Sequence, residues 1–217
     1  MADEPTVPVW DRFVRLFHWG SAGLVLLAYL TTDDARGPHE FAGYAVLVLI
    51  VARAVWGIVG TQHALFISFI AGPRAVLRYL ALLRAGRAPR HLGHNPAGGA
   101  MIVALLLLLT IVSGSGWLSQ TDAWFGVPWV DHLHHISAHL LLGLIALHVA
   151  GVIVSSWLHQ ENLVLAMITG RKPAGSGVGS KFERERRTTT VALHGPDGAT
   201  MRSGDARDDG KAQARSG

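Results

Sequence analysis

The chain has 217 residues, of which 50% are hydrophobic and 16% charged, and its formal net charge is +4. It has no cysteine, which excludes disulfides, thiolate-bound metals, iron–sulfur clusters and the covalent attachment of c-type haem. Long stretches without Asp, Glu, Lys or Arg, at 16–32, 91–121 and 132–160, exclude an ordinary soluble domain. Most basic residues flank these stretches or follow them, which favours a membrane surface over nucleic acid as their partner.

Four membrane-spanning helices are predicted along the chain. They cover about Leu16–Thr32, Phe41–Gly60, Gly98–Leu118 and His134–Leu158, and only the second is interrupted by a charge, at Arg53. Apolar runs of this length are typical of transmembrane helices rather than of helices in a soluble core. No removable signal peptide is expected, so the first span is predicted to be retained. The fold class is therefore predicted to be all-α, an integral membrane four-helix bundle.

The charges of the connecting segments predict the orientation. The segment 61–97 carries five arginines and no acid, and basic residues also precede the first span and follow the fourth. The other two connections are poor in basic residues. Because basic connections stay on the cytoplasmic side, both termini are predicted to be cytoplasmic.

Three further elements are predicted outside the spans. Pro73–Arg87 alternates arginine with leucine and valine at helical spacing, which indicates an amphipathic helix in the inner membrane interface. Asn95 followed by Pro96 is typical of a helix cap and first turn, and begins the third span. Residues 1–172 are expected to form one domain, and residues 173–217, rich in Gly, Ser, Thr and Arg, a disordered cytoplasmic tail.

Twelve histidines in so apolar a chain need an explanation. Histidine inside a bilayer is costly and usually faces the bundle interior, where it pairs or binds a ligand. His134 and His148 are 14 residues apart, which is about 40° short of four full turns and a rise of about 21 Å. The neighbouring His135 and His139 are far out of phase with His148. One helix therefore presents two histidines on one face at two depths.

Partners for these two histidines are predicted at matching depths. His18 begins the first span near the inner side, and His39 precedes the second span near the outer side. Two opposed imidazole pairs would form two bis-histidine sites, one above the other. Neutral imidazole suits iron, and two axial nitrogens leave no open position, which favours electron transfer. Spacing alone does not choose haem over a zinc site or a proton pathway, and any single histidine near a membrane end could be merely interfacial.

Arg53 is the other costly residue within a span. It follows His39 by 14 residues and so shares its face, at the depth of the inner pair. One hypothesis is that Arg53 binds a propionate of an inner haem, with Arg15 as a second partner. The alternative is that Arg53 extends to the cytoplasmic surface.

Several segments resemble the bacterial cytochrome b561 and nickel–iron hydrogenase b-type cytochrome family. The resemblance covers about residues 8–172 and is carried by the segments 15–19, 39–44, 52–60, 93–96 and 134–148. It implies a four-helix bundle with two b haems in the bacterial inner membrane. It also implies iron ligands at His18, His39, His134 and His148, and electron exchange with the quinone pool.

The predicted function is therefore a dihaem membrane cytochrome that carries electrons between quinone and a periplasmic partner, such as a c-type cytochrome or a hydrogenase. No residue is assigned to a quinone site, although His94 and Asn95 could line one. An apolar outer patch at 124–129 favours docking of a protein. Two alternatives stay open: a stand-alone redox enzyme such as a superoxide:quinone oxidoreductase, and a histidine-lined metal or proton transporter.

Overall fold

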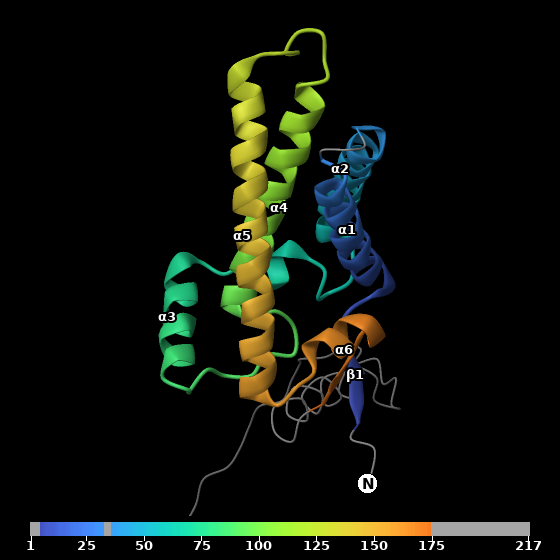
Figure 1. The fold of residues 1–217 in the computed structure, drawn as a ribbon. Coiled ribbons are helices and arrows are strands. Elements are labelled where there is room, and N and C mark those ends of the chain that lie inside the picture. Colours follow the sequence, from blue (N-terminus) through green and yellow to red (C-terminus); the bar gives the residue numbers. More distant parts are fainter. Residues whose placement is uncertain (1–4, 33–35, 175–217) are drawn as a thin grey trace, which may run out of the picture. The chain divides into compact units, whose positions relative to one another are not determined.

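The computed structural model describes residues 5–32 and 36–174. The described part is mostly helical, with four long helices that are long and apolar enough to cross a membrane: α1 (Arg12–Leu30), α2 (Arg36–Val59), α4 (Pro96–Leu118) and α5 (Pro128–His159). Two shorter helices, α3 (Pro73–Arg84) and α6 (Leu163–Thr169), a single 3₁₀ turn (Phe66–Ser68) and two short strands, β1 (Thr6–Pro8) and β2 (Arg171–Pro173), complete it (Figure 1). The predicted all-α membrane fold with four spans is confirmed.

Three of the long helices, α1, α2 and α5, begin earlier than predicted, and the local sequence explains two of these starts. The α1 helix starts at Arg12 because the Asp11 carboxylate accepts a hydrogen bond from Val14 N at 2.8 Å and caps it. The α5 helix starts at Pro128, whose fixed φ suits a first turn. In both cases polar residues occupy the first turns, so a criterion based on unbroken apolar runs begins the helix too late.

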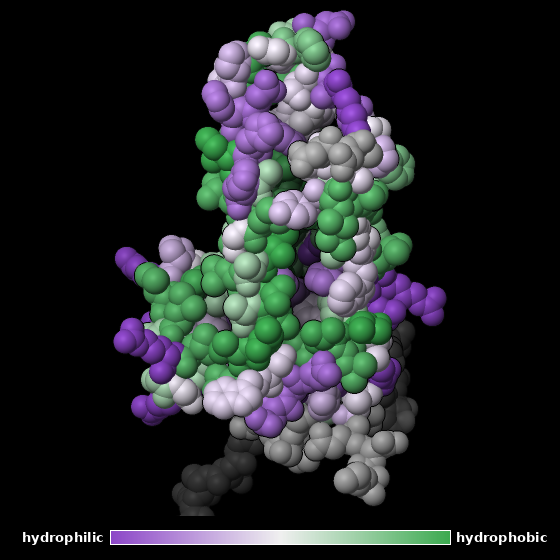
Figure 2. All heavy atoms as spheres, in the orientation of Figure 1, coloured by the Kyte–Doolittle hydropathy of each residue, from purple (hydrophilic) through white to green (hydrophobic). Residues whose placement is uncertain are grey.

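The closest helix packing runs in one chain of neighbours: α1 against α2, α2 against α4, and α4 against α5. Val46, Leu109 and Leu141 form the buried centre of this packing. Many large apolar side chains on the outer faces are exposed, as expected where lipid rather than protein covers them. Figure 2 shows hydrophobic side chains across the middle of one face, with hydrophilic ones above and below.

The predicted amphipathic helix is present as α3, which packs against α4. Its apolar residues Leu77 and Leu80 are exposed, and Tyr79 is buried. The helix ends at Arg84 rather than at the predicted Arg87 because Gly86 adopts a left-handed φ of 66°.

The strands and α6 were not predicted. Strands β1 and β2 are antiparallel, and Val7 lies opposite Lys172, so the two ends of the described chain lie on the same side of the bundle. Gly170 makes this possible, because it ends α6 with a φ of 80° and its carbonyl accepts hydrogen bonds from Val9 and Trp10. A Cβ at this position would lie only 2.6 Å from Trp10 O. The predicted domain boundary at 172 and the disordered tail stay predictions, since residues 175–217 lie outside the described residues.

Candidate functional site

One pair of histidines lies between α2 and α5. The ring centres of His39 and His134 are 6.1 Å apart, with an angle of 73° between the ring planes. His39 Nδ1 lies 2.8 Å from Ala28 O, and His134 Nδ1 lies 2.9 Å from Val112 O. A carbonyl can only accept, so Nδ1 is the protonated nitrogen of each ring, and in the neutral imidazole Nε2 keeps its lone pair. This arrangement is typical of a histidine that binds a metal through Nε2.

A second pair lies between α1 and α5. The ring centres of His18 and His148 are 6.3 Å apart, with an interplanar angle of 56°. His18 Nδ1 is buried and has no hydrogen-bond partner among the described residues. The ring of Trp19 meets His18 edge-on at 4.9 Å. The structure therefore brings together both pairs that the sequence predicted, each at its own depth along α5.

The residues fit a bound macrocycle held by two imidazoles. With metal–imidazole nitrogen bonds of about 2 Å, the two ring centres on one metal would lie about 6 Å apart. Unliganded aromatic pairs also occur at such distances, so a second observation is needed. The second observation is the packing of the backbone. Helices α1 and α2 carry the histidines that face α5, yet α1 packs more closely against α2, and α2 against α1 and α4, than either does against α5. Figure 1 shows α1 and α2 on one side and α4 and α5 on the other.

Small residues border the outer pair. A Cβ on Gly116 would lie 3.0 Å from His134 Cε1, so α4 approaches this imidazole as closely as a glycine allows. Gly43 lies one turn below His39, and no atom lies within 4 Å of the place where its Cβ would be. Space is therefore open next to His39, and the backbone of α4 lies close to His134. Both features are compatible with a flat ligand between the two imidazoles.

A layer of apolar side chains separates the two pairs. Leu141 lies midway between His134 and His148 on α5, and Val46 lies seven residues after His39 on α2. Spacings of seven keep residues on one helix face, and Leu141 and Val46 are 4% and 3% exposed in the same cluster. The two sites are therefore distinct, with a buried apolar layer between them.

Comparisons with known proteins show the family to which the chain belongs. The sequence model described as prokaryotic cytochrome b561 matches residues 9–170, which include all four long helices and both histidine pairs. The chain belongs to the prokaryotic cytochrome b561 family. It is also similar to a protein of Bradyrhizobium diazoefficiens named probable Ni/Fe-hydrogenase B-type cytochrome subunit, with 24% identity over 216 residues covering 78% of this chain and 87% of the relative. No solved structure matches the chain.

Membership of the cytochrome b561 family confirms the resemblance found in the sequence. The chain is a multi-pass membrane b-type cytochrome, with haem b as the cofactor and electron transfer as its general role. The described residues contain no group of three or more His, Asp or Glu that could hold a metal ion.

Arg53 is buried in this cytochrome rather than extended to the surface. The residue is 3% exposed; its Nη2 donates to Ala64 O at 3.0 Å, and its guanidinium lies 4.9 Å from the centre of the Phe66 ring. Its Nη1 is buried without a hydrogen-bond partner, and no carboxylate pairs with it among residues 5–32 and 36–174. Burying an uncompensated charge is costly, so the missing partner is expected to be an anion.

The remaining candidates lie elsewhere. Arg15 Nη1 donates to Thr169 O at 3.0 Å, and the side chain lies along the surface of α1. His132, His135 and His139 are exposed on α5, in agreement with their predicted interfacial role. Asn95 accepts a hydrogen bond from Gly98 N at 2.7 Å, so it caps α4 as predicted.

His94 is a partly buried histidine whose role the sequence left open. Its ring lies 4.4 Å from that of Trp10 and 4.9 Å from that of Phe69, and its Nδ1 has no hydrogen-bond partner in the described part of the chain. Burial, followed by the nearby cations Arg53 and Lys172, lowers the pKa of His94 to about 3. The imidazole is therefore neutral at physiological pH.

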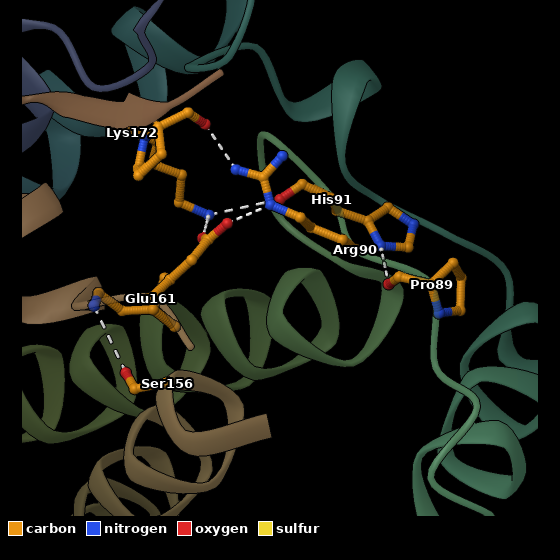
Figure 3. Close-up of polar contacts among 8 residues, drawn as sticks. Pro89, Arg90, His91, Ser156, Glu161 and Lys172 are labelled. Atoms are coloured by element: carbon orange, nitrogen blue, oxygen red, sulfur yellow. Dashed lines mark hydrogen bonds and ion pairs between the residues drawn. The ribbon is translucent and has the colours of Figure 1, made fainter. Parts of the chain in front are cut away.

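A buried ionic cluster lies near His94 and was not predicted. Glu161, between α5 and α6, pairs with Arg90 from the α3–α4 connection and with Lys172 of β2, whose Nζ lies 3.6 Å from Glu161 Oε2 (Figure 3). Lys172 also donates to His91 O, and Arg90 to Pro173 O at 2.6 Å. The cluster joins three segments that are far apart in the sequence, so no local motif could have revealed it.

Proposed function

We propose that this cytochrome holds two b haems and transfers electrons across the bacterial inner membrane, between the quinone pool and a redox partner at the periplasmic face. One observation carries the proposal: two opposed histidine pairs lie at two depths of one bundle, about 21 Å apart along α5. His18 and His148 would hold the inner iron, and His39 and His134 the outer one. When bound, haem b supplies one-electron redox chemistry at each site.

The protein's own residues prepare these sites. Ala28 O and Val112 O orient the outer imidazoles so that Nε2 can bind a metal. Two histidines per site leave no open coordination position, which favours electron transfer over the binding of small molecules. The buried layer around Leu141 fills the space between the sites with apolar side chains.

The proposed orientation follows from charge. The inner pair lies toward the end of the bundle that carries the arginine-rich segment 61–97, and this end is proposed to be cytoplasmic. Quinone is the proposed reactant there. The outer pair lies toward the opposite end, where a partner in the periplasm could exchange electrons with it.

The outer end supports a protein partner. Helix α5 has 32 residues, or about 48 Å, which exceeds a hydrocarbon core of about 30 Å. The connection before it exposes Trp124 and Phe125, and Trp129 is exposed in the first turn of α5. The rings of Trp124 and Trp129 meet edge-on, with their centres 5.4 Å apart. Exposed aromatic residues are typical of docking surfaces. The name of the Bradyrhizobium relative makes a hydrogenase-like protein the first proposed partner. A c-type cytochrome is the alternative proposed partner.

The test is a spectrum of the protein purified from membranes, with haem quantified per chain. Two b haems per chain, both reduced by a soluble quinol, are expected. A colourless protein, or one haem per chain in fully loaded material, would contradict the dihaem proposal. Rapid reduction by superoxide with no partner present would instead favour the stand-alone redox enzyme.

Arg53 gives a second test, because we infer that its unpartnered Nη1 binds a propionate of the inner haem. Changing Arg53→Leu removes a buried positive charge and is expected to lower the midpoint potential of the inner haem by roughly 60 mV, which is a tenfold change in a one-electron equilibrium. The outer haem should keep its potential. Arg53→Lys should restore part of the shift, and the exposed Arg78→Leu serves as the control. An unchanged redox titration of Arg53→Leu would refute this role.

A further inference from the structure

A surface groove lies where α1 meets the end of α6. It has a volume of about 590 Å³ and is lined by Arg12, Arg15, Leu16, Trp19 and Ile168. The first four occur at positions i, i+3, i+4 and i+7 of α1, so they share one face of the helix. Most of the lining is apolar, and the two guanidinium groups supply its charge.

The two arginines have no acidic partner in the described part of the chain. Neither forms an ion pair there, and the one hydrogen bond recorded for their side chains is from Arg15 Nη1 to Thr169 O, at 3.0 Å. That bond holds the guanidinium of Arg15 at the edge of the groove and leaves its other nitrogens for a further acceptor. Two adjacent guanidinium groups with free donors suit a phosphate, which they can bind through paired hydrogen bonds.

The apolar part of the groove faces the lipid side of α1. Leu16 is 71% exposed, Trp19 44% and Ile168 53%. Leu16 and Trp19 lie one to two turns into the membrane helix α1, whereas Arg12 begins it. Tryptophan is enriched at the boundary between hydrocarbon and headgroups, and arginine there attracts anionic lipids. An occupant must therefore join an anionic group to an apolar chain.

We propose that this groove binds one anionic phospholipid, with its phosphate between Arg12 and Arg15 and an acyl chain along Leu16 and Trp19. A basic pocket between helices at the membrane boundary has the chemistry that retains such headgroups. The lipid would link α1 to α6, because Ile168 and the Thr169 carbonyl come from α6. It would also lie next to the inner histidine pair, since Trp19 contacts His18.

The test compares lipid retention in two double variants. The protein is placed in nanodiscs of equal parts phosphatidylglycerol and phosphatidylethanolamine, re-extracted in detergent, and its bound lipid counted by native mass spectrometry. R12Q/R15Q is expected to retain phosphatidylglycerol about tenfold less than the unchanged chain, because it loses two cations at the phosphate. The control R74Q/R78Q removes two exposed arginines from α3, outside the groove, and should retain the lipid.

Three outcomes would overturn the proposal. They are equal retention by R12Q/R15Q and the unchanged chain, equal loss in R74Q/R78Q, and displacement of the lipid by inorganic phosphate alone. Haem content and helicity of both variants, measured in parallel, separate loss of the lipid from loss of the fold. Lipid retention, haem content and helicity can all be measured without quinone and without a redox partner.

Discussion

Changing His148→Ala should reduce the haem content from two per chain to one. Truncation removes one of the two imidazoles of the inner pair, and the remaining His18 cannot hold the iron from both sides. The outer pair should be unaffected, because the apolar layer around Leu141 separates the two sites. Haem per chain and the reduced-minus-oxidised spectrum measure the result.

The other ligand variants make this prediction sharper. His18→Ala should give the same spectrum and potential as His148→Ala, whereas His39→Ala and His134→Ala should share the complementary phenotype. The control is His139→Ala, which changes an exposed histidine on the same helix. If His18→Ala and His134→Ala behaved alike, or if His139→Ala lost haem, the pairing would be wrong.

Glu161→Gln is expected to be the most destabilising single change outside the membrane spans. The Glu161 and Lys172 side chains are 7% and 6% exposed, and Glu161 is the carboxylate that balances both Lys172 and Arg90. Removing one partner from a buried ion pair typically costs about 3–5 kcal/mol, since a charge is left buried without compensation. Thermal unfolding of the detergent-solubilised protein should show a large fall in Tm.

This change should also alter the pH dependence of stability. Burial lowers the pKa of Lys172, while Glu161 opposes that shift. Without Glu161 the pKa of Lys172 in the folded protein falls further. Below the ordinary lysine pKa the unfolded chain then binds more protons than the folded protein, so the stability of the variant rises with pH. The loss of stability in Glu161→Gln, relative to the unchanged chain, should therefore be smaller at pH 9 than at pH 7.

The solvent-accessible pair Arg36–Glu40 offers a matched control, because its side chains are 69% and 31% exposed. Glu40→Gln also removes one carboxylate from an ion pair, but water reaches this pair, so the change is expected to alter stability by less than about 1 kcal/mol. Equal losses in the two variants, or a Glu161→Gln deficit that grows with pH, would contradict the argument from burial.

Much of the fold could be predicted because a bilayer imposes simple rules on a sequence. A spanning helix needs about 20 apolar residues, and the apolar runs of this chain located all four helices. The errors fell at helix ends such as Arg12 and Pro128, where a cap or a proline extends the helix into polar sequence. The phase of a regular helix is equally predictable, so the shared face of His134 and His148 followed from their spacing.

The sequence by itself thus determined the four spans and the candidate histidines, since both depend on local periodicity and on the cost of polar groups in lipid. Only the tertiary structure decided which groups meet. It placed Arg53 in a buried position with an unpartnered nitrogen, brought Arg90, Glu161 and Lys172 together from three separate segments, and formed the groove between α1 and α6. Such contacts join residues far apart along the chain, and their geometry depends on helix packing and loop paths that local periodicity does not encode.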